Sequence, residues 1–194
     1  RYDHAWLLAR LEQEAQAREV EIFLAHYREK YTAAPPQPPV WMAIELLTFK
    51  AVSILFGNLR HSPDTQRISR HFGLPHVVLR SWFRSVSDLR NLCAHHMRVW
   101  NREFGSTPLL PKKPPRNWPG IPESIASGAH QQPEQRLHPQ RRLYMQLVVI
   151  ETLMQVVSPS SRWAERLVRL LDAHPKVSRT HMGFPPGWEG EVLW

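Results

Sequence analysis

The sequence of 194 residues contains little cysteine and little glycine, and it has no long apolar run. Its single cysteine, Cys93, excludes an internal disulfide framework and suits a reducing compartment. The eight glycines form no phosphate-cradling loop. No stretch approaches the roughly 18 apolar residues that a membrane-spanning helix needs, and no signal peptide is visible. These absences predict a cytoplasmic protein that does not act at a membrane.

Metal-binding patterns are also missing, although the chain has eleven histidines. There is no HExxH motif, no paired-cysteine motif and no acidic cluster near the adjacent His95 and His96. Neighbouring residues on a helix face different directions, so these two histidines are poorly placed as ligands of one ion. The sequence therefore predicts neither a metal site nor a cofactor.

Positive charge is in excess, with a formal net charge of +8 and a pI near 10.2. Between Ser81 and Arg102 there are four arginines and only one acidic residue, Asp88. Such an excess favours polyanionic partners through counterion release, although a basic surface can also serve only to keep a protein in solution. We interpret it as support for a nucleic-acid partner.

Proline divides the chain into segments with helical patterns, and no strand-like alternation of any length is present. Asp3 is the expected N-cap of the first helix, and Ser160 or Ser161 that of the last. From Gly105 to Pro122 there are six prolines and no periodicity, which predicts a long loop. We expect one all-α domain over residues 1–194. Its helices are expected at residues 3–30, 40–59 (apolar around much of its surface and therefore central), 62–72, 75–101, 141–157 and 161–174.

The most informative run lies at residues 90–102 and reads RNLCAHHMRVWNR. If the helix continues through it, a rotation of about 100° per residue divides its side chains into two faces. The face expected to be buried holds Trp82, Val86, Leu89, Cys93, His96 and Trp100. The opposite, polar face holds Arg90, Asn91, His95, Arg98, Asn101 and Arg102.

This polar set has the chemistry needed to bind and cleave a phosphodiester without a metal. Arg90 can hold a phosphate bidentately and stabilise charge on its oxygens. His95 can exchange protons near neutral pH, and Asn91 can orient it or bind the phosphate or ribose. The alternative is an exposed and inert pair, since an arginine and a histidine at this spacing also occur by chance. His96 is expected to be a core or supporting histidine.

The proline-rich loop directly follows this run and carries Lys112, Lys113, Arg116 and Trp118. Together they can grip a nucleic-acid backbone and stack a base. The loop can equally be a surface strap that ties the motif helix to the rest of the protein, and both interpretations stay open.

The run at residues 90–102 resembles the signature of the Abi-like (abortive infection) proteins, RNxCAHHxRxWNR, with Val99 where leucine is more usual. That family belongs to the HEPN superfamily of small helical proteins. It usually has a further N-terminal segment, and because this chain starts at Arg1 without methionine we expect that its natural N-terminal segment is missing. Other family-like features are Asp3–Leu7, His26–Tyr27, Pro38–Met42, Ser81–Phe83, His174–Pro175, Met182–Pro185, Trp188 and Trp194.

The resemblance implies an all-α, HEPN-like helical bundle with a long proline-rich loop after the motif helix. Many HEPN ribonucleases use an arginine and a histidine separated by four to six residues, often with a polar residue just after the arginine. Arg90, Asn91 and His95 match that pattern as catalytic residues. It implies a homodimer whose motifs face each other, and metal-independent RNA cleavage through the 2′-hydroxyl that leaves 2′,3′-cyclic phosphate ends and spares DNA. The residues expected to bind RNA or to support the catalytic ones are His96, Arg98, Asn101, Arg102, Lys112, Lys113 and Arg116.

The resemblance also implies a role: a toxin-like endonuclease of an abortive-infection, anti-phage system. The alternative is a non-catalytic HEPN module that binds a small regulatory RNA or a partner protein such as an antitoxin. A third possibility, a structural or regulatory dimer, predicts a polar face without affinity for phosphate. Binding that weakens steeply with salt would count against that third possibility.

Overall fold

The computed structural model describes residues 4–17, 21–33, 38–59, 63–125 and 137–194. The chain forms two compact units, residues 1–60 and 61–194. The predicted all-α class is confirmed, because the described residues form helices and one isolated bridge between Ile125 and Leu137, without a strand. A single domain over residues 1–194 stays a prediction.

The described residues of the first unit form four helices where two were expected. Between the first pair, Glu21 has an extended backbone (φ −68°, ψ 115°), so the prediction of one helix over residues 3–30 is wrong. No proline or glycine marks this break in the sequence, and the expected N-cap Asp3 lies outside the described residues. The four helices are α1 (His4–Ala17), α2 (Ile22–Lys30), α3 (Val40–Leu46) and α4 (Phe49–Asn58).

The helix expected over residues 40–59 is also interrupted. Leu47 and Thr48 are extended, and the Thr48 hydroxyl accepts a hydrogen bond from the backbone N–H of Ala51 at 3.3 Å. Threonine is a favoured N-cap because its oxygen satisfies an N–H group that has no partner in the helix. The sequence therefore contained a signal for this break. The expected central position is not matched along α3, whose exposed side chains are Val40, Trp41 and Ile44.

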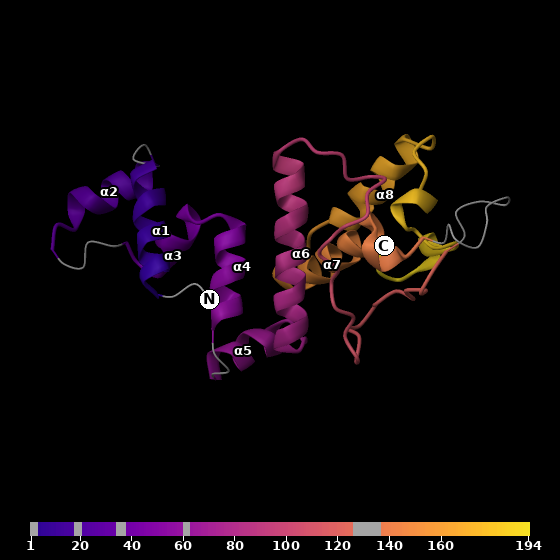
Figure 1. The fold of residues 1–194 in the computed structure, drawn as a ribbon, viewed down its shortest axis with the longest axis horizontal. Helices are drawn as coiled ribbons and strands as arrows, with labels where there is room; N and C mark the ends of the chain where they lie inside the picture. Colours follow the sequence, from indigo (N-terminus) through magenta and orange to yellow (C-terminus); the bar gives the residue numbers. More distant parts are fainter. Residues whose placement is uncertain (1–3, 18–20, 34–37, 60–62, 126–136) are drawn as a thin grey trace. The chain divides into compact units, whose positions relative to one another are not determined.

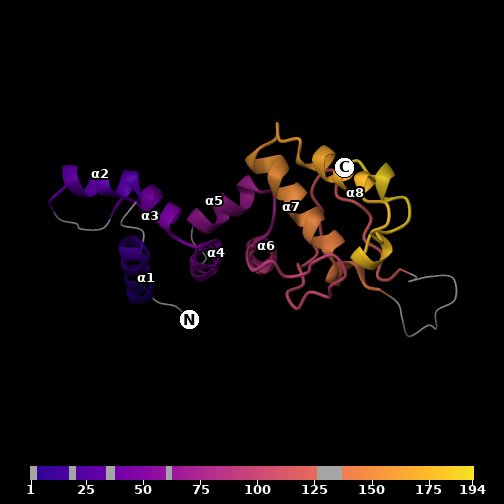
Figure 2. The ribbon, with the colours of Figure 1, turned by 90° about the horizontal axis from the view of Figure 1, so that it is seen from above.

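The second unit is built around α7 (Leu143–Val157), in which every residue from Leu143 to Val149 is buried. Figures 1 and 2 show α7 beside α6 (His76–Ala94), with α8 (Trp163–Ala173) on its other side. α5 (Pro63–His71) precedes α6, and short 3-10 turns lie at Pro139–Arg141, Thr180–Met182 and Trp188–Gly190. The core consists of Leu89, Phe104, Leu143, Tyr144, Leu147, Val148, Leu171, Met182, Phe184, Trp188 and Leu193.

The expected helices over 62–72, 141–157 and 161–174 are confirmed to within two residues. The predicted cap of the last helix is wrong. Its N-cap is Arg162, which makes no capping hydrogen bond through its side chain, in place of Ser160 or Ser161. Arg162 binds Glu165 in the first turn instead, with Nη2 2.7 Å from the carboxylate. That ion pair is exposed to solvent and contributes little to the stability of the helix start.

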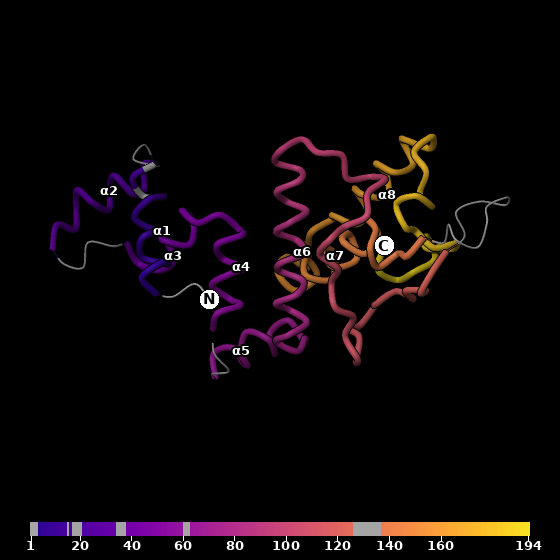
Figure 3. The backbone as a smooth tube through the Cα atoms, viewed as in Figure 1, coloured from indigo at the N-terminus to yellow at the C-terminus, as the bar shows by residue number. Residues whose placement is uncertain are grey.

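The proline-rich segment is a loop, as predicted, and it lies along α6 (Figure 3). Ser85 donates to the Ser106 carbonyl at 3.1 Å, and the Trp82 indole N–H donates to the Leu109 carbonyl at 2.9 Å. Further along, Trp118 stacks on Trp82 with ring centroids 5.3 Å apart. These contacts show that the loop acts as a strap on α6, one of the two interpretations of its sequence.

The C-terminal tail fixes the chain just before α7. Gly183 has φ +90°, and a Cβ atom there would lie 2.5 Å from Cβ of Arg142 and 3.3 Å from Cα of Pro139. Only glycine fits so close an approach with that backbone conformation. Phe184 then packs against Tyr144 and Trp188, with ring centroids 4.8 and 4.7 Å apart. The tail thus holds Arg142, whose side chain reaches the motif segment.

Two titratable groups are buried in α7. Burial raises the pKa of Tyr144 to about 12. Burial also raises the pKa of Glu151, while a hydrogen bond from Gln155 at 3.4 Å acts in the opposite direction. Both side chains lie in the interior of the second unit, so α7 serves packing and offers no exposed carboxylate for acid–base chemistry.

Candidate functional site

The motif helix α6 ends at Ala94, and its predicted continuation to Asn101 is wrong. The backbone N–H of Met97 donates to the Leu92 carbonyl at 2.8 Å, and that of His96 donates to the Cys93 carbonyl at 3.0 Å. This pair of hydrogen bonds is the Schellman motif, which closes a helix C-terminus. The motif therefore divides into a last helical turn and a following irregular segment.

The two adjacent histidines are located at this helix end. His95 is the C-cap, with φ −94° and ψ 14°, in the sparsely populated region where active-site residues often occur. His96 has φ +53°, the left-handed conformation that helix ends usually assign to glycine. For a residue with a Cβ atom this conformation costs about 1 kcal/mol, although histidine adopts it more readily than most residues. The backbone at His96 is therefore strained.

The early termination changes which side chains are buried. Trp82 and Leu89 are buried and Val86 is half-buried, as the helical pattern predicts. The other three members of the predicted buried face are exposed, which corrects the prediction for Cys93, His96 and Trp100. The period of 3.6 residues no longer applies beyond Ala94, and the last helical turn extends past Leu89, the last fully buried residue of α6.

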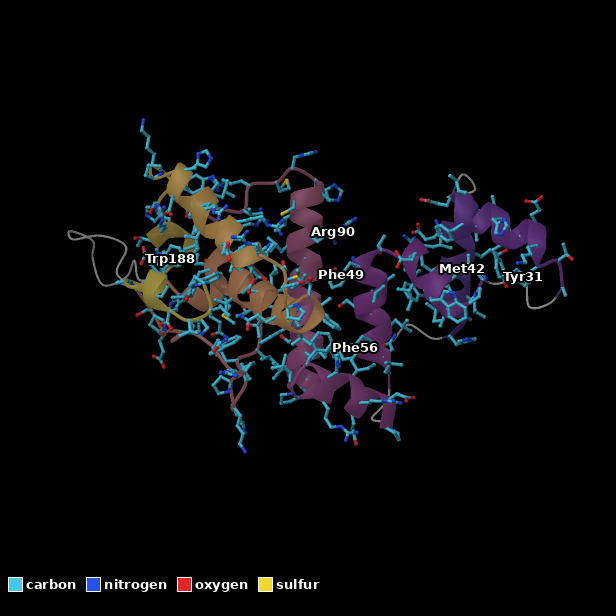
Figure 4. The ribbon with its side chains drawn as sticks, turned by 180° about the vertical axis from the view of Figure 1, so that it is seen from behind. Tyr31, Met42, Phe49, Phe56, Arg90 and Trp188 are labelled. Atoms are coloured by element: carbon cyan, nitrogen blue, oxygen red, sulfur yellow. The ribbon has the colours of Figure 1, made fainter. Side chains whose placement is uncertain are left out.

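Arg90, Asn91 and His95 come together in the last turn and cap of α6. The Arg90 guanidinium is exposed and donates from Nη1 to the Asn91 side-chain oxygen at 3.3 Å (Figure 4). The Asn91 carbonyl accepts the backbone N–H of His95 at 3.0 Å. Asn91 thus contacts Arg90 through its side chain and His95 through its backbone, and its catalytic role stays a prediction.

Positive charge at this helix end is not neutralised by neighbouring acids. Arg90, Arg98 and Arg102 form no ion pair with any carboxylate of the described residues, while Glu103 pairs with Arg141 at 3.0 Å. The C-terminus of a helix carries partial negative charge, which stabilises cations and repels anions. A phosphate at this site must therefore be held by the arginine side chains, unlike the phosphates bound by backbone N–H groups at helix N-termini.

The segment after the histidines is anchored at alternate points. Val99 packs against the core, and the Asn101 side-chain oxygen accepts a hydrogen bond from Arg142 at 3.4 Å. Between them Trp100 is 43% exposed, with the Arg98 guanidinium 5.9 Å from its ring centroid. Sequence periodicity gave no sign of this exposed aromatic ring. Its signal was the alternation of arginine and tryptophan, which is typical of nucleic-acid contacts.

The structure does not bring the loop cations to the motif. Lys112, Lys113 and Arg116 are exposed, and the chain that carries them is fixed at both ends beside Trp82. Along α6, thirteen residues separate Trp82 from His95, which is about 20 Å of helix. These cations can contact a polyanion only at a distance from Arg90 and His95, and their binding role stays a prediction.

Neither a metal-binding cluster nor a membrane-spanning helix occurs in the described parts of the chain. No group of three or more His, Cys, Asp or Glu residues among them is arranged to hold a metal ion. None of their helices combines the length and apolar character needed to cross a membrane. The first unit has an open cavity of about 370 Å³ between α1 and α4, lined among others by Trp6, Arg10 and Lys50.

Comparison with known proteins bears directly on the helix that carries the motif. The family model of the Abi-like proteins matches residues 1–101, a region that includes α6, both histidines and the segment up to Asn101. The chain belongs to the Abi-like protein family. No curated protein and no solved structure matches it.

The family match ends at Asn101, so the remaining features of this Abi-like protein lie outside it. They include the strap over α6, the central helix α7 and the aromatic tail. The family assignment makes this an abortive-infection-related protein. Its placement in the HEPN superfamily is compatible with the helical fold and remains an expectation.

Proposed function

We propose that this Abi-like protein is a metal-independent RNA endonuclease of an abortive-infection system, with Arg90 and His95 as its catalytic residues at a homodimer cleft. The observation that carries the proposal is the exposed end of α6. There an arginine free of ion pairs within the described residues, an amide and a histidine lie within one and a half helical turns.

RNA requires little more than this set, because its 2′-hydroxyl is an internal nucleophile. A base takes the proton of the 2′-hydroxyl, O2′ attacks phosphorus, and the bond from phosphorus to O5′ breaks as O5′ receives a proton. His95 supplies proton transfer, and Arg90 stabilises the negative charge that grows on the phosphate oxygens. The products are a 2′,3′-cyclic phosphate and a 5′-hydroxyl. Because the catalytic groups are exposed, a second copy of the chain can face them and complete the cleft.

The direct test is incubation of the pure protein with labelled single-stranded RNA in EDTA. We expect cleavage that leaves cyclic phosphate ends, no cleavage of DNA of the same sequence, and no cleavage at a site where one 2′-hydroxyl is replaced by hydrogen. His95→Ala prepared in parallel identifies any contaminating nuclease. Cross-linking and light scattering of the same preparation measure the expected dimer.

Three outcomes contradict the proposal. Equal cleavage by the parent and by His95→Ala assigns the activity to a contaminant. Tight binding without cleavage, weakening steeply as salt rises, identifies a non-catalytic module that binds RNA through its phosphates. Loss of both binding and cleavage leaves a structural or regulatory role for the motif.

Trp100 is expected to serve as a stacking surface for an unpaired base. Stacking of one base on an aromatic ring contributes about 1–3 kcal/mol, so Trp100→Ala should weaken binding of single-stranded RNA by roughly 5- to 150-fold. Fluorescence anisotropy with a labelled oligonucleotide measures this change. Trp100→Phe keeps an aromatic face and should recover most of the affinity.

The matched control is Trp41→Ala, because Trp41 is also exposed but lies on α3 in the other compact unit. We expect its affinity for RNA to stay within about twofold of the parent. Equal losses in both variants, or no loss in Trp100→Ala, would show that the ring beside Arg98 does not contact the RNA.

A further inference from the structure

We propose that His96 is a second catalytic residue, which exchanges a proton with the RNA together with His95 of the same chain. One motif would then supply both the acid and the base of the cleavage. This inference rests on the proposed ribonuclease activity and adds to it, because Arg90 and His95 alone provide one proton-transfer group in each chain.

Exposure is the first observation behind this assignment. The helical pattern placed His96 on the buried face, where a packing role was expected, but the structure places both His95 and His96 at the surface. Neither imidazole makes a hydrogen bond or ion pair with another described residue. Both are therefore available to a substrate held by Arg90, which lies about one and a half turns before the His95 cap of α6.

Backbone strain is the second observation. His96 occupies the left-handed position of the Schellman motif, with φ +53°, where glycine would fit without strain. Because the side chain at this helix end is exposed, it makes no packing contacts that would offset the cost of the strained backbone. Strained positions of this kind concentrate at functional sites, where the side chain is needed for its chemistry.

The two histidines are adjacent in the chain, which keeps both close to one phosphodiester. Their Cα atoms are about 3.8 Å apart, as in any trans peptide. The backbone φ changes from −94° at His95 to +53° at His96, so the two residues differ in conformation. Cleavage needs one proton-transfer group at O2′ and another at O5′, and these oxygens lie on opposite sides of phosphorus.

The imidazoles of His95 and His96 account for every proton that moves during the cleavage step. One imidazole accepts the proton of the 2′-hydroxyl as the bond from O2′ to phosphorus forms. The other, starting as the imidazolium, gives its proton to O5′ as the bond from phosphorus to O5′ breaks. The two imidazoles end with their protonation states exchanged, and water restores them after the products leave.

The decisive variant is His96→Gly, because glycine removes the imidazole and the backbone strain together. We expect the melting temperature to rise by about 2–4 °C, the shift typical of relieving a small strain in a protein of this size. We also expect the cleavage rate to fall by about 10²- to 10⁴-fold, as for loss of a general acid or base. Affinity for an uncleavable 2′-deoxy analogue of the substrate should stay within a few-fold.

A second variant tests whether the change to glycine itself lowers the rate, and a control tests whether loss of any exposed histidine does so. His96→Asn keeps a side chain that tolerates the left-handed conformation, and it should lose the same activity as His96→Gly. His174→Ala removes another exposed histidine, the C-cap of α8, and should leave the cleavage rate unchanged. Circular dichroism of each variant verifies the helical fold.

A modified substrate separates the two roles. An RNA with sulfur in place of the bridging O5′ has a leaving group that departs without a proton. We expect it to restore cleavage by one of the variants His95→Ala and His96→Gly, the one that lacks the acid, and not by the other.

Three outcomes overturn the proposal. If the parent cleaves RNA and His96→Gly cleaves it within threefold of that rate, His96 is not catalytic and the proposed ribonuclease function still stands. If His96→Gly is slow but the sulfur substrate rescues neither variant, His96 does not form an acid–base pair with His95. If the parent cleaves no RNA, the proposed function and this inference fail together.

Discussion

Arg90→Ala is expected to lower the rate of RNA cleavage by about 10²- to 10³-fold, with the fold intact. The guanidinium is exposed, pairs with no carboxylate of the described residues, and shares a hydrogen bond only with Asn91. Its removal therefore leaves no buried charge behind and should change stability by less than about 0.5 kcal/mol. Loss of one preorganised group that stabilises transition-state charge costs about 3–4 kcal/mol of activation free energy. Single-turnover kinetics with saturating protein measure this loss apart from binding.

The matched control is Arg84→Ala, which removes an exposed arginine six residues earlier on α6. It has the same effect on net charge, so the two variants should lose similar amounts of nonspecific, salt-dependent affinity. Only Arg90→Ala should lose the rate of the chemical step. Arg90→Lys provides a finer comparison, because lysine keeps the charge without bidentate geometry and should recover only part of the rate. Equal rates for Arg84→Ala and Arg90→Ala would show that Arg90 supplies charge and no specific contact.

Trp82→Ala is expected to lower the free energy of unfolding of the second unit by about 3–5 kcal/mol. The side chain is fully buried, and removal of so large a ring leaves a cavity that the surroundings fill only in part. The stack on Trp118 and the hydrogen bond to the Leu109 carbonyl are lost as well. Urea unfolding followed by circular dichroism measures the change.

Trp82→Phe separates packing from hydrogen bonding at this position. Phenylalanine keeps an aromatic ring against Trp118 but leaves the Leu109 carbonyl without its donor, at a cost of about 1–2 kcal/mol. Trp41→Ala removes an exposed tryptophan from the other unit and should change stability by no more than about 0.5 kcal/mol. A loss below 1 kcal/mol for Trp82→Ala would contradict the packing of the strap on α6.

The strap affects the site only by holding the helix that carries it. The loop holds α6 through residues in its first two-thirds, including Trp82, Ser85 and Asp88, whose carboxylate accepts a hydrogen bond from Ser106. The last turn, with Arg90 and His95, extends beyond these contacts and stays open. Trp82→Ala should therefore reduce cleavage through loss of folded protein, and the activity per folded molecule should stay near that of the parent.

Helical patterns in the sequence predicted the helices whose ends are marked by proline or glycine. Pro63, Gly73 and Pro75 bound α5 and begin α6, and Ser158-Pro159 separates the last two helices, all close to the expected positions. The extended residue at Glu21 and the Thr48 cap were missed. Nothing local marks the first break, and the second is marked only by one threonine inside an apolar run.

The candidate site was predicted in composition but only partly in geometry. Arg90, Asn91 and His95 do lie together at one end of α6, as their spacing required. His96 and Trp100 were assigned to the buried face because periodicity was extended past Ala94. A helix without glycine or proline at its end gives no local sign of where it stops, since histidine adopts the left-handed conformation far less often than glycine does.

By itself, the sequence determined the helical class, the family and the identity of the residues around Arg90 and His95, because periodicity, proline positions and a thirteen-residue motif are local properties of the chain. Only the tertiary structure decided where α6 ends, which motif side chains face solvent, and that Trp118 packs on Trp82 while the neighbouring cations stay remote from the histidines. The physical reason is that burial depends on segments far apart in the chain, and such segments also hold the residues that follow the end of α6. The core around α7 and the tail that holds Arg142 against Asn101 fix the start of the segment that follows His96.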